Sequence, residues 1–123
     1  MTQSTIPDGL KKYLIPAFKR KAKSITALNL IQFSTYTDTL IIIECGSKRQ
    51  VSSIAEHLIK SLKKKKVKAI GMEGMRDSEW ALIDYGEVVI HIFESEAKSF
   101  FDLEGLWADA PRIDLVELEK IHG

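Results

Sequence analysis

The sequence has a single cysteine, Cys45, among its 123 residues. This scarcity excludes a disulfide framework and a cluster of thiolate metal ligands, and it is typical of proteins that work in a reducing cytosol. No apolar run reaches the length of a membrane-spanning helix. Residues 1–5 have neither the apolar core of a secretory signal nor the arginines of a presequence. These absences predict a cytoplasmic protein.

The chain also lacks an excess of charge of one sign, since 18 Lys and Arg residues face 17 Asp and Glu residues. The charge is nevertheless unevenly placed: residues 11–23 and 60–68 are basic, whereas residues 73–104 are mainly acidic. The acidic half predicts a basic partner more than a phosphate. The lysines at 63–66 fit a solvated helix end better than a nucleic-acid patch, because no aromatic residues are interleaved with them.

The length and the 45% hydrophobic content predict one domain with one core. Apolar spacing predicts a helix from Pro7 to about residue 23 and a strand over residues 24–33. The aliphatic run at 40–43 indicates a central strand that is covered on both faces. A further strand is expected over residues 67–71, and the strand–helix–strand order predicts that it runs parallel to the central strand.

A second helix is predicted between these two strands. Ser47 and Gln50 have the spacing of a capping box, in which both side chains serve free backbone donors of the first turn. The expected buried stripe of this helix consists of Val51, Ile54, Ala55, Leu58 and Leu62. Together with the hairpin described next, these elements predict a mixed α/β fold, a single domain whose mixed sheet of about five strands is flanked by helices.

Residues 80–93 form the most informative stretch, in which two β-rich runs flank Tyr85 and Gly86. With these two as the loop of a hairpin, Asp84 pairs with Glu87 and Trp80 lies opposite His91. One face then carries Trp80, Leu82, Val89, His91 and Phe93, and the other is uniformly aliphatic. The aliphatic face is predicted to be core. The face with the indole and the imidazole, which has acidic residues nearby, is predicted to recognise a partner.

The remaining residues predict short elements. Ser95 is expected to cap a helix over residues 96–101, with another turn from 102 to 107. The domain is expected to end at residue 110. Residues 111–123 then form a C-terminal tail that is predicted to be loosely ordered.

Candidate catalytic sets are weak. Gly46 and Ser47 stand at a strand-to-helix turn, where nucleotidyltransferases grip a triphosphate, but the strand at 67–71 offers no carboxylates for metal ions. His57, His91 and His122 have no neighbours at ligand spacing, and the hairpin separates Asp84 from His91. We therefore expect no metal, no cofactor and no enzyme activity. Two alternatives to a partner-binding protein remain: a nucleotidyltransferase-like enzyme, and an RNA-binding module that uses the lysine clusters.

Several short motifs, in order along residues 24–110, resemble the bacterial ribosomal silencing factors, also called iojap-like proteins. The motifs are Thr37-Asp38, Gly46-Ser47 with Arg49-Gln50-Val51, Glu73-Gly74, Trp80 with Asp84-Tyr85-Gly86, Val89 to Phe93, and Leu103-Glu104 with Leu106-Trp107. The resemblance implies a nucleotidyltransferase-like topology without the catalytic carboxylates. The sequence departs from the family at Lys98, where Arg is usual, and at Phe101, where Tyr is usual, so donors that relatives have there are missing.

The resemblance also implies a function. Family members bind ribosomal protein uL-fourteen on the large ribosomal subunit, block its association with the small subunit and repress translation under nutrient limitation. The residues implied as partner contacts are Glu73, Trp80, Asp84, Tyr85 and His91, with Leu106 and Trp107 beside them. Members of the family often self-associate, and an apolar hairpin face is one way to close a homodimer. The residues leave monomer and homodimer open.

Overall fold

The computed structural model describes residues 2–3, 6–74 and 78–122. In these residues, seven strands form one sheet in the order β1-β7-β2-β3-β6-β5-β4. The strands are β1 (Thr2–Gln3), β2 (Ser24–Asn29), β3 (Thr39–Cys45), β4 (Gly71–Glu73), β5 (Trp80–Asp84), β6 (Val88–Glu94) and β7 (Arg112–Ile113). The helices are α1 (Asp8–Phe18), α2 (Lys48–Lys64), α3 (Lys98–Leu106) and α4 (Val116–His122). None of the helices in this part of the chain is long and apolar enough to cross a membrane.

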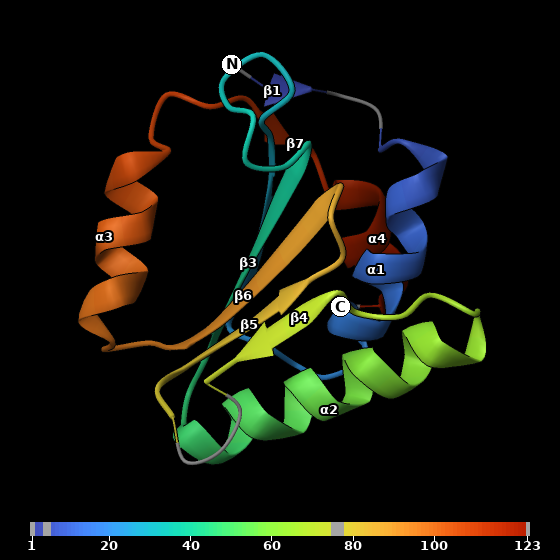
Figure 1. Ribbon diagram of the computed structural model, residues 1–123, viewed down its shortest axis with the longest axis vertical. Helices are drawn as coiled ribbons and strands as arrows, with labels where there is room; N and C mark the ends of the chain where they lie inside the picture. Colours follow the sequence, from blue (N-terminus) through green and yellow to red (C-terminus); the bar gives the residue numbers. More distant parts are fainter. Residues whose placement is uncertain (1, 4–5, 75–77, 123) are drawn as a thin grey trace.

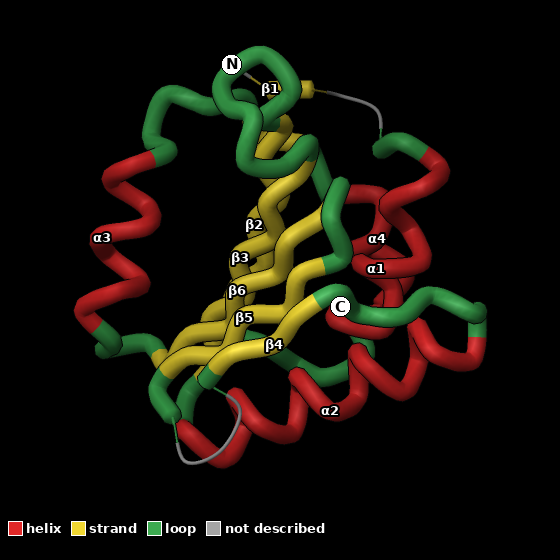
Figure 2. Tube along the Cα trace, in the orientation of Figure 1, coloured by secondary structure: helices red, strands yellow, loops and turns green. Residues whose placement is uncertain are grey.

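The helices divide unequally over the sheet. Helices α1, α2 and α4 lie on one side and α3 lies alone on the other (Figures 1 and 2). The side of the three helices holds the larger core, which includes Ile41, Ile43, Ile90 and Ile92 from the two central strands. The α3 side holds a smaller core around Leu40, Ile42, Val89 and Phe93. The mixed α/β fold predicted from the sequence is confirmed, with two short strands, β1 and β7, beyond the expected five.

The predicted centre of the sheet is correct. Strand β3 is buried on both faces at residues 40–43 and pairs in parallel with β6, while it pairs antiparallel with β2. Strand β2 ends at Asn29, four residues earlier than predicted. There the Asn29 side-chain oxygen accepts a hydrogen bond from the Ile31 N–H at 3.1 Å, a local turn that competes with strand pairing.

Ser47 caps α2 as predicted, but Gln50 bonds the residue before the N-cap rather than the N-cap itself, so only half of the predicted capping box forms. The Ser47 hydroxyl accepts a hydrogen bond from the Gln50 N–H at 3.2 Å, and the Gln50 amide oxygen accepts one from the Gly46 N–H at 2.7 Å. The buried residues of the helix are the five predicted, Val51, Ile54, Ala55, Leu58 and Leu62. The turn at Gly46-Ser47 therefore has a structural explanation in the start of α2.

The strand after α2 is not where the sequence predicted it. Residues 67–70 lie outside any strand, and β4 covers only residues 71–73 at the edge of the sheet, antiparallel to β5. Residue 67 still belongs to the turn that ends α2, because the Val67 N–H donates a hydrogen bond to the Leu62 carbonyl at 2.9 Å. The strand therefore begins later than predicted. The hairpin β5–β6 lies between β4 and β3, so the parallel neighbour of β3 is β6.

The hairpin is present, but its register differs by two residues from the predicted one. Trp80 pairs with Phe93 and Leu82 pairs with His91, and Gly86 and Glu87 are the loop residues. Gly86 takes a φ of +86° at the first loop position, which suits a type II′ turn rather than type I′. Because a shift of two residues is even, every side chain stays on its predicted face.

The C-terminal part of the chain is more ordered than predicted. The two expected short helices are one helix, α3, whose N-cap is Ala97, because the Ser95 hydroxyl donates to the Cys45 carbonyl at 2.9 Å instead of capping. The expected loose tail after residue 110 forms β7 and α4. Ile113, Leu115 and Leu118 from this segment belong to the larger core, so the domain does not end at residue 110.

A mutation in α4 tests this packing. Leu118 is 2% exposed, so Leu118→Ala removes buried methyl groups and should lower the free energy of unfolding by about 2–5 kcal/mol. Ile121→Ala, at a side chain on the same helix that is 67% exposed, is the matched control and should change it by less than about 0.5 kcal/mol. Urea denaturation of both variants measures the difference. Equal, small effects would mean that α4 contributes nothing to the core.

Candidate partner-binding surface

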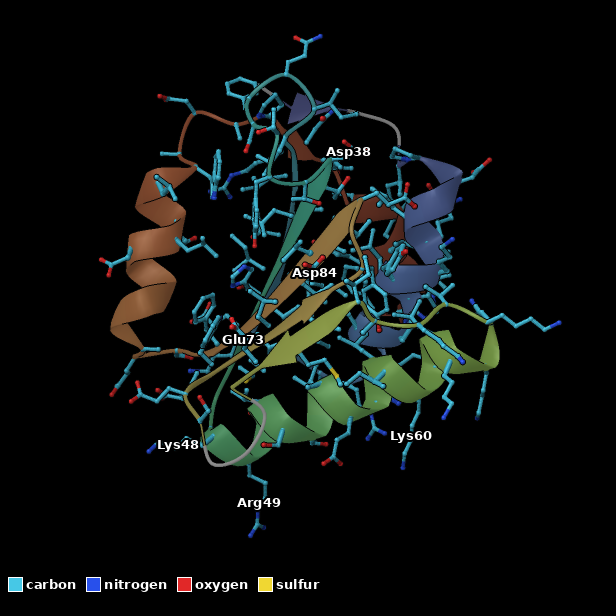
Figure 3. All side chains as sticks on the ribbon, in the orientation of Figure 1. Asp38, Lys48, Arg49, Lys60, Glu73 and Asp84 are labelled. Atoms are coloured by element: carbon cyan, nitrogen blue, oxygen red, sulfur yellow. The ribbon has the colours of Figure 1, made fainter. Side chains whose placement is uncertain are left out.

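The α3 side of the sheet brings five of the relevant side chains together. The ladders align Glu73 on β4, Leu82 on β5 and His91 on β6 in one row across the sheet. Trp80 and Asp84 belong to the same face of β5 as Leu82, since side chains alternate along a strand. Figure 3 shows Glu73 and Asp84 on neighbouring strands. Tyr36 joins them from the loop before β3, and we call Tyr36, Glu73, Trp80, Asp84 and His91 the Trp80 surface.

Trp80 and His91 hold each other in place. The Trp80 Nε1–H donates to His91 Nδ1 at 3.0 Å, and the two rings stack with centroids 6.0 Å apart. His91 also stacks on Phe93 at 5.7 Å. Because the indole N–H can only donate, Nδ1 must be unprotonated, and the neutral imidazole carries its proton on Nε2. The predicted proximity of Trp80 and His91 is thus confirmed, although the two residues are diagonal neighbours rather than directly opposite.

Burial decides the protonation state of His91. His91 is 7% exposed while Trp80 is half-buried, so the indole covers the imidazole and keeps an edge in water. Burial lowers the pKa of His91 to about 4. The ring is therefore neutral at pH 7 and acts as a fixed acceptor for the indole.

Tyr36 is the member of the surface that sequence reasoning missed. Its hydroxyl lies 3.5 Å from His91 Nε2, and the residue is 49% exposed. Burial raises the pKa of Tyr36, and the carboxylates of Asp84 and Glu73 raise it further. The loop that carries Tyr36 is tied to the hairpin turn, since the Thr37 hydroxyl donates a hydrogen bond to the Gly86 carbonyl at 2.9 Å. A single aromatic residue in a polar connection was the only signal in the sequence.

The two carboxylates differ in their surroundings. Glu73 is exposed on the edge strand. Asp84 is half-buried, and one of its oxygens accepts a hydrogen bond from the Gly86 N–H at 2.7 Å, which helps to fix the hairpin turn. Both add negative charge beside the aromatic pair, so the surface combines an ordered indole with an acidic border.

Tyr85 lies away from this surface. Its ring packs against Tyr13 with centroids 5.3 Å apart, in the larger core on the opposite side of the sheet. It is 8% exposed, and burial raises its pKa to about 12, with Tyr13 adding to the effect. A residue so placed supports the hairpin from the interior and offers no area to a partner in this conformation.

The two contact residues predicted at the end of α3, Leu106 and Trp107, lie in different surroundings. Leu106 is 69% exposed, whereas the half-buried Trp107 packs with Leu103, Trp80 and Leu82 on the smaller core. Trp107 therefore packs on the same smaller core as Trp80, whereas Leu106 is an exposed apolar side chain at the end of α3. At Lys98 and Phe101, where the sequence departs from the family pattern, the structure describes the backbone of α3 but not the side chains.

The rival catalytic sets are not assembled in the described residues. Ser47 caps α2, Asp84 holds the hairpin turn, and His91 bonds Trp80. Within the same residues, no three His, Cys, Asp or Glu side chains lie close enough together to hold a metal ion. The face that the sequence singled out carries aromatic rings and carboxylates, with Trp80 and His91 bonded to each other and Asp84 bonded to the hairpin turn.

Comparison with known proteins identifies the family of this chain. The family model described as "Ribosomal silencing factor during starvation" matches residues 3–122. The chain belongs to the ribosomal silencing factor family. It is 35% identical over 96 residues to a ribosomal silencing factor from Halalkalibacterium halodurans, covering 78% of this chain and 82% of that protein. It is 36% identical over 101 residues to one from Haemophilus influenzae, covering 82% and 89%.

The fold of this chain resembles that of solved structures. A crystal structure of a protein from Bacillus halodurans superposes with a TM-score of 0.79 at 30% identity, covering 88% of this chain and 98% of that one. The match of the family model extends through β7 and α4. The C-terminal segment is therefore part of the family's domain.

The depressed pKa of His91 gives a prediction of pH dependence. The unfolded histidine titrates near 6.5, so His91 contributes stability that is complete above that pH and is lost as the pH falls through about 4. The loss amounts to roughly 3 kcal/mol of unfolding free energy. His91→Gln keeps an acceptor for the indole but does not titrate, so its stability should fall less than that of the wild type between pH 7 and 4. An imidazole NMR titration in which His91 changes near pH 6.5 would contradict this.

Proposed function

We propose that this protein represses translation in the cytoplasm by binding ribosomal protein uL-fourteen on the large ribosomal subunit, where it sterically blocks joining of the small subunit under nutrient limitation. The Trp80 surface is the proposed contact. The observation that carries the proposal is the indole fixed by His91 and bordered by Glu73 and Asp84. Membership of a family named for ribosomal silencing supports the same conclusion.

The physical properties of the surface suit a basic ribosomal protein. Carboxylates at the border attract a cationic partner over several ångströms and raise the rate of association. The half-buried indole then supplies apolar area at the centre. Because its hydrogen bond and its stacking on His91 already restrict the ring, little side-chain entropy remains to be lost on binding. Such an ordered aromatic residue is typical of interface hot spots.

In this mechanism the protein acts by occupying space. A silencing factor of this kind needs an interface that persists and a body large enough to obstruct the approaching small subunit, and it needs no turnover. The exposed Leu106 at the end of α3 would extend the contact beside Trp80. The buried Tyr85 would support the hairpin from the other side of the sheet, and the half-buried Trp107 would pack on the same smaller core as Trp80.

Sucrose-gradient sedimentation tests the function. Added wild-type protein should move with free large subunits and should reduce the peak of joined ribosomes as its concentration rises. The expected cause is direct competition between the protein and the small subunit for one face. Co-sedimentation with small subunits, or an unchanged peak of joined ribosomes at saturating protein, would refute the proposal.

The central residue is tested by Trp80→Ala. Loss of a hot spot should cost about 2 kcal/mol or more of binding free energy, which is about a thirty-fold increase in Kd for large subunits. Trp80→Phe retains most of the packing if the alanine variant folds poorly. Met72→Ala is the matched control: Met72 is 52% exposed on neighbouring β4, but it pairs with Ile83 and so faces the other side of the sheet. Equal effects of Trp80→Ala and Met72→Ala would show that the contact lies elsewhere.

A further inference from the structure

The two basic segments of the sequence approach each other where α1 ends beside the C-terminal half of α2. Residues 19–23 follow α1 and contain four of the 18 Lys and Arg residues, and residues 60–68 at the end of α2 contain six more. Helices α1 and α2 pack against each other. No Asp or Glu occurs in residues 9–37 or 57–72. The Lys23 side chain lies apart from the others, beside Gly46 at the start of α2. We call Lys19, Arg20 and residues 60–68 the basic end.

A cleft of about 220 Å³ lies between the two helices at this end. Lys19 from the end of α1 and Lys64 and Lys65 from α2 line it, together with His57 and Ser61. The three lysines are exposed. Cations from two helices thus surround one concave site, and the Ser61 hydroxyl adds a neutral donor.

Within the described residues, no salt bridge involves the lysines that line the cleft. The salt bridge found in that part of the chain joins Lys11 to Glu117, outside the basic end. The Arg20 guanidinium instead donates to His57 Nδ1 at 3.1 Å. Burial lowers the pKa of His57, and the charges of Arg20, Lys19 and Lys64 lower it further, while the Pro16 carbonyl acts in the opposite direction. A neutral histidine among cations indicates a local positive potential that an anion would relieve.

We propose that the basic end is a binding surface for the phosphate backbone of RNA, centred on the cleft between α1 and α2. From sequence alone, the lack of aromatic residues among the lysines favours a solvated helix end, but the structure adds Lys19 from α1 and a cleft between the helices. Without a ring to stack on bases, the contacts would be with phosphates, so binding should be independent of sequence. The choice of RNA over other polyanions rests on the proposed ribosomal function. The site itself is separate from the Trp80 surface, since the two lie on opposite sides of the sheet.

The arrangement gives the protein two unlike contacts. The acidic Trp80 surface repels phosphates and fits a basic protein, whereas the basic end repels such a protein and fits RNA. On a ribosome, where proteins and RNA adjoin, the two contacts would fix the orientation of the bound factor as well as its affinity.

The test compares two double variants of α2. Lys64→Gln with Lys65→Gln removes two charges at the cleft, and Lys48→Gln with Arg49→Gln removes two at the other end of the same helix, where both residues are exposed (Figure 3). Binding of a labelled RNA hairpin is measured by fluorescence anisotropy over a series of salt concentrations. Each lost phosphate contact lowers the slope of log K against log salt by about 0.9. We expect a slope lower by almost two for the first variant and an unchanged slope for the second.

Lys19→Gln provides a second, single variant from the opposite wall of the cleft, with an expected slope reduction of about one. NMR titration adds a local readout: RNA phosphates in the cleft should raise the pKa of His57, whereas phosphates bound elsewhere should not. Equal slope changes in the two double variants, failure of the wild type to bind RNA, or equally tight binding of polyglutamate would overturn the proposal.

These outcomes are distinct from those of the ribosomal contact. If the Trp80 surface is not the partner site, Trp80→Ala leaves binding to large subunits unchanged, and the RNA slopes still differ between the two double variants. If the basic end is not an RNA site, the double variants have equal slopes, and Trp80→Ala still weakens binding to large subunits.

Discussion

The parallel ladder between β3 and β6 is the constraint on which the rest of the structure depends. It joins seven consecutive residue pairs, from Thr39 with Val88 to Cys45 with Glu94. Because side chains alternate along each strand, this register assigns Ile90 and Ile92 to the side of three helices and His91 to the side of α3. A shift of one residue would exchange the two faces and would place the imidazole among aliphatic side chains. Because β5 pairs with β6 in the hairpin, Trp80 lies on the same side of the sheet as His91.

The parts of the fold with strong local patterns were predictable. The aliphatic run of β3 and the spacing of the buried stripe of α2 each identify an element and its buried face, and the capping box identifies where α2 begins. The short elements were not predictable in this way. Strands β4 and β7 have three and two residues, too few for a periodic pattern, and α4 is stabilised by packing of Leu118 on the core rather than by its own sequence.

The site shows the same division. The face that carries Trp80 and His91 follows from alternation, and an error of two residues in the register leaves it intact. The error itself arose because glycine suits either position of a two-residue loop. Tertiary packing decides between them: the Tyr85 ring is held in the core against Tyr13, so Gly86 becomes the first loop residue. Tyr36 could not be assigned from sequence, because its position over His91 depends on the path of a loop that Thr37 ties to the hairpin.

The two outermost strands have a consequence for the behaviour of the protein at high concentration. Strands β1 and β4 bound the sheet and contain only two and three residues. The three residues of β4 offer few unpaired backbone groups to an incoming strand, so this edge of the sheet is a poor template for growth by addition of further copies. The long, strongly hydrophobic strands that would serve as such a template, β3 and β6, are enclosed by neighbours on both sides. The two longest strands are therefore not accessible to a strand of another copy of the protein.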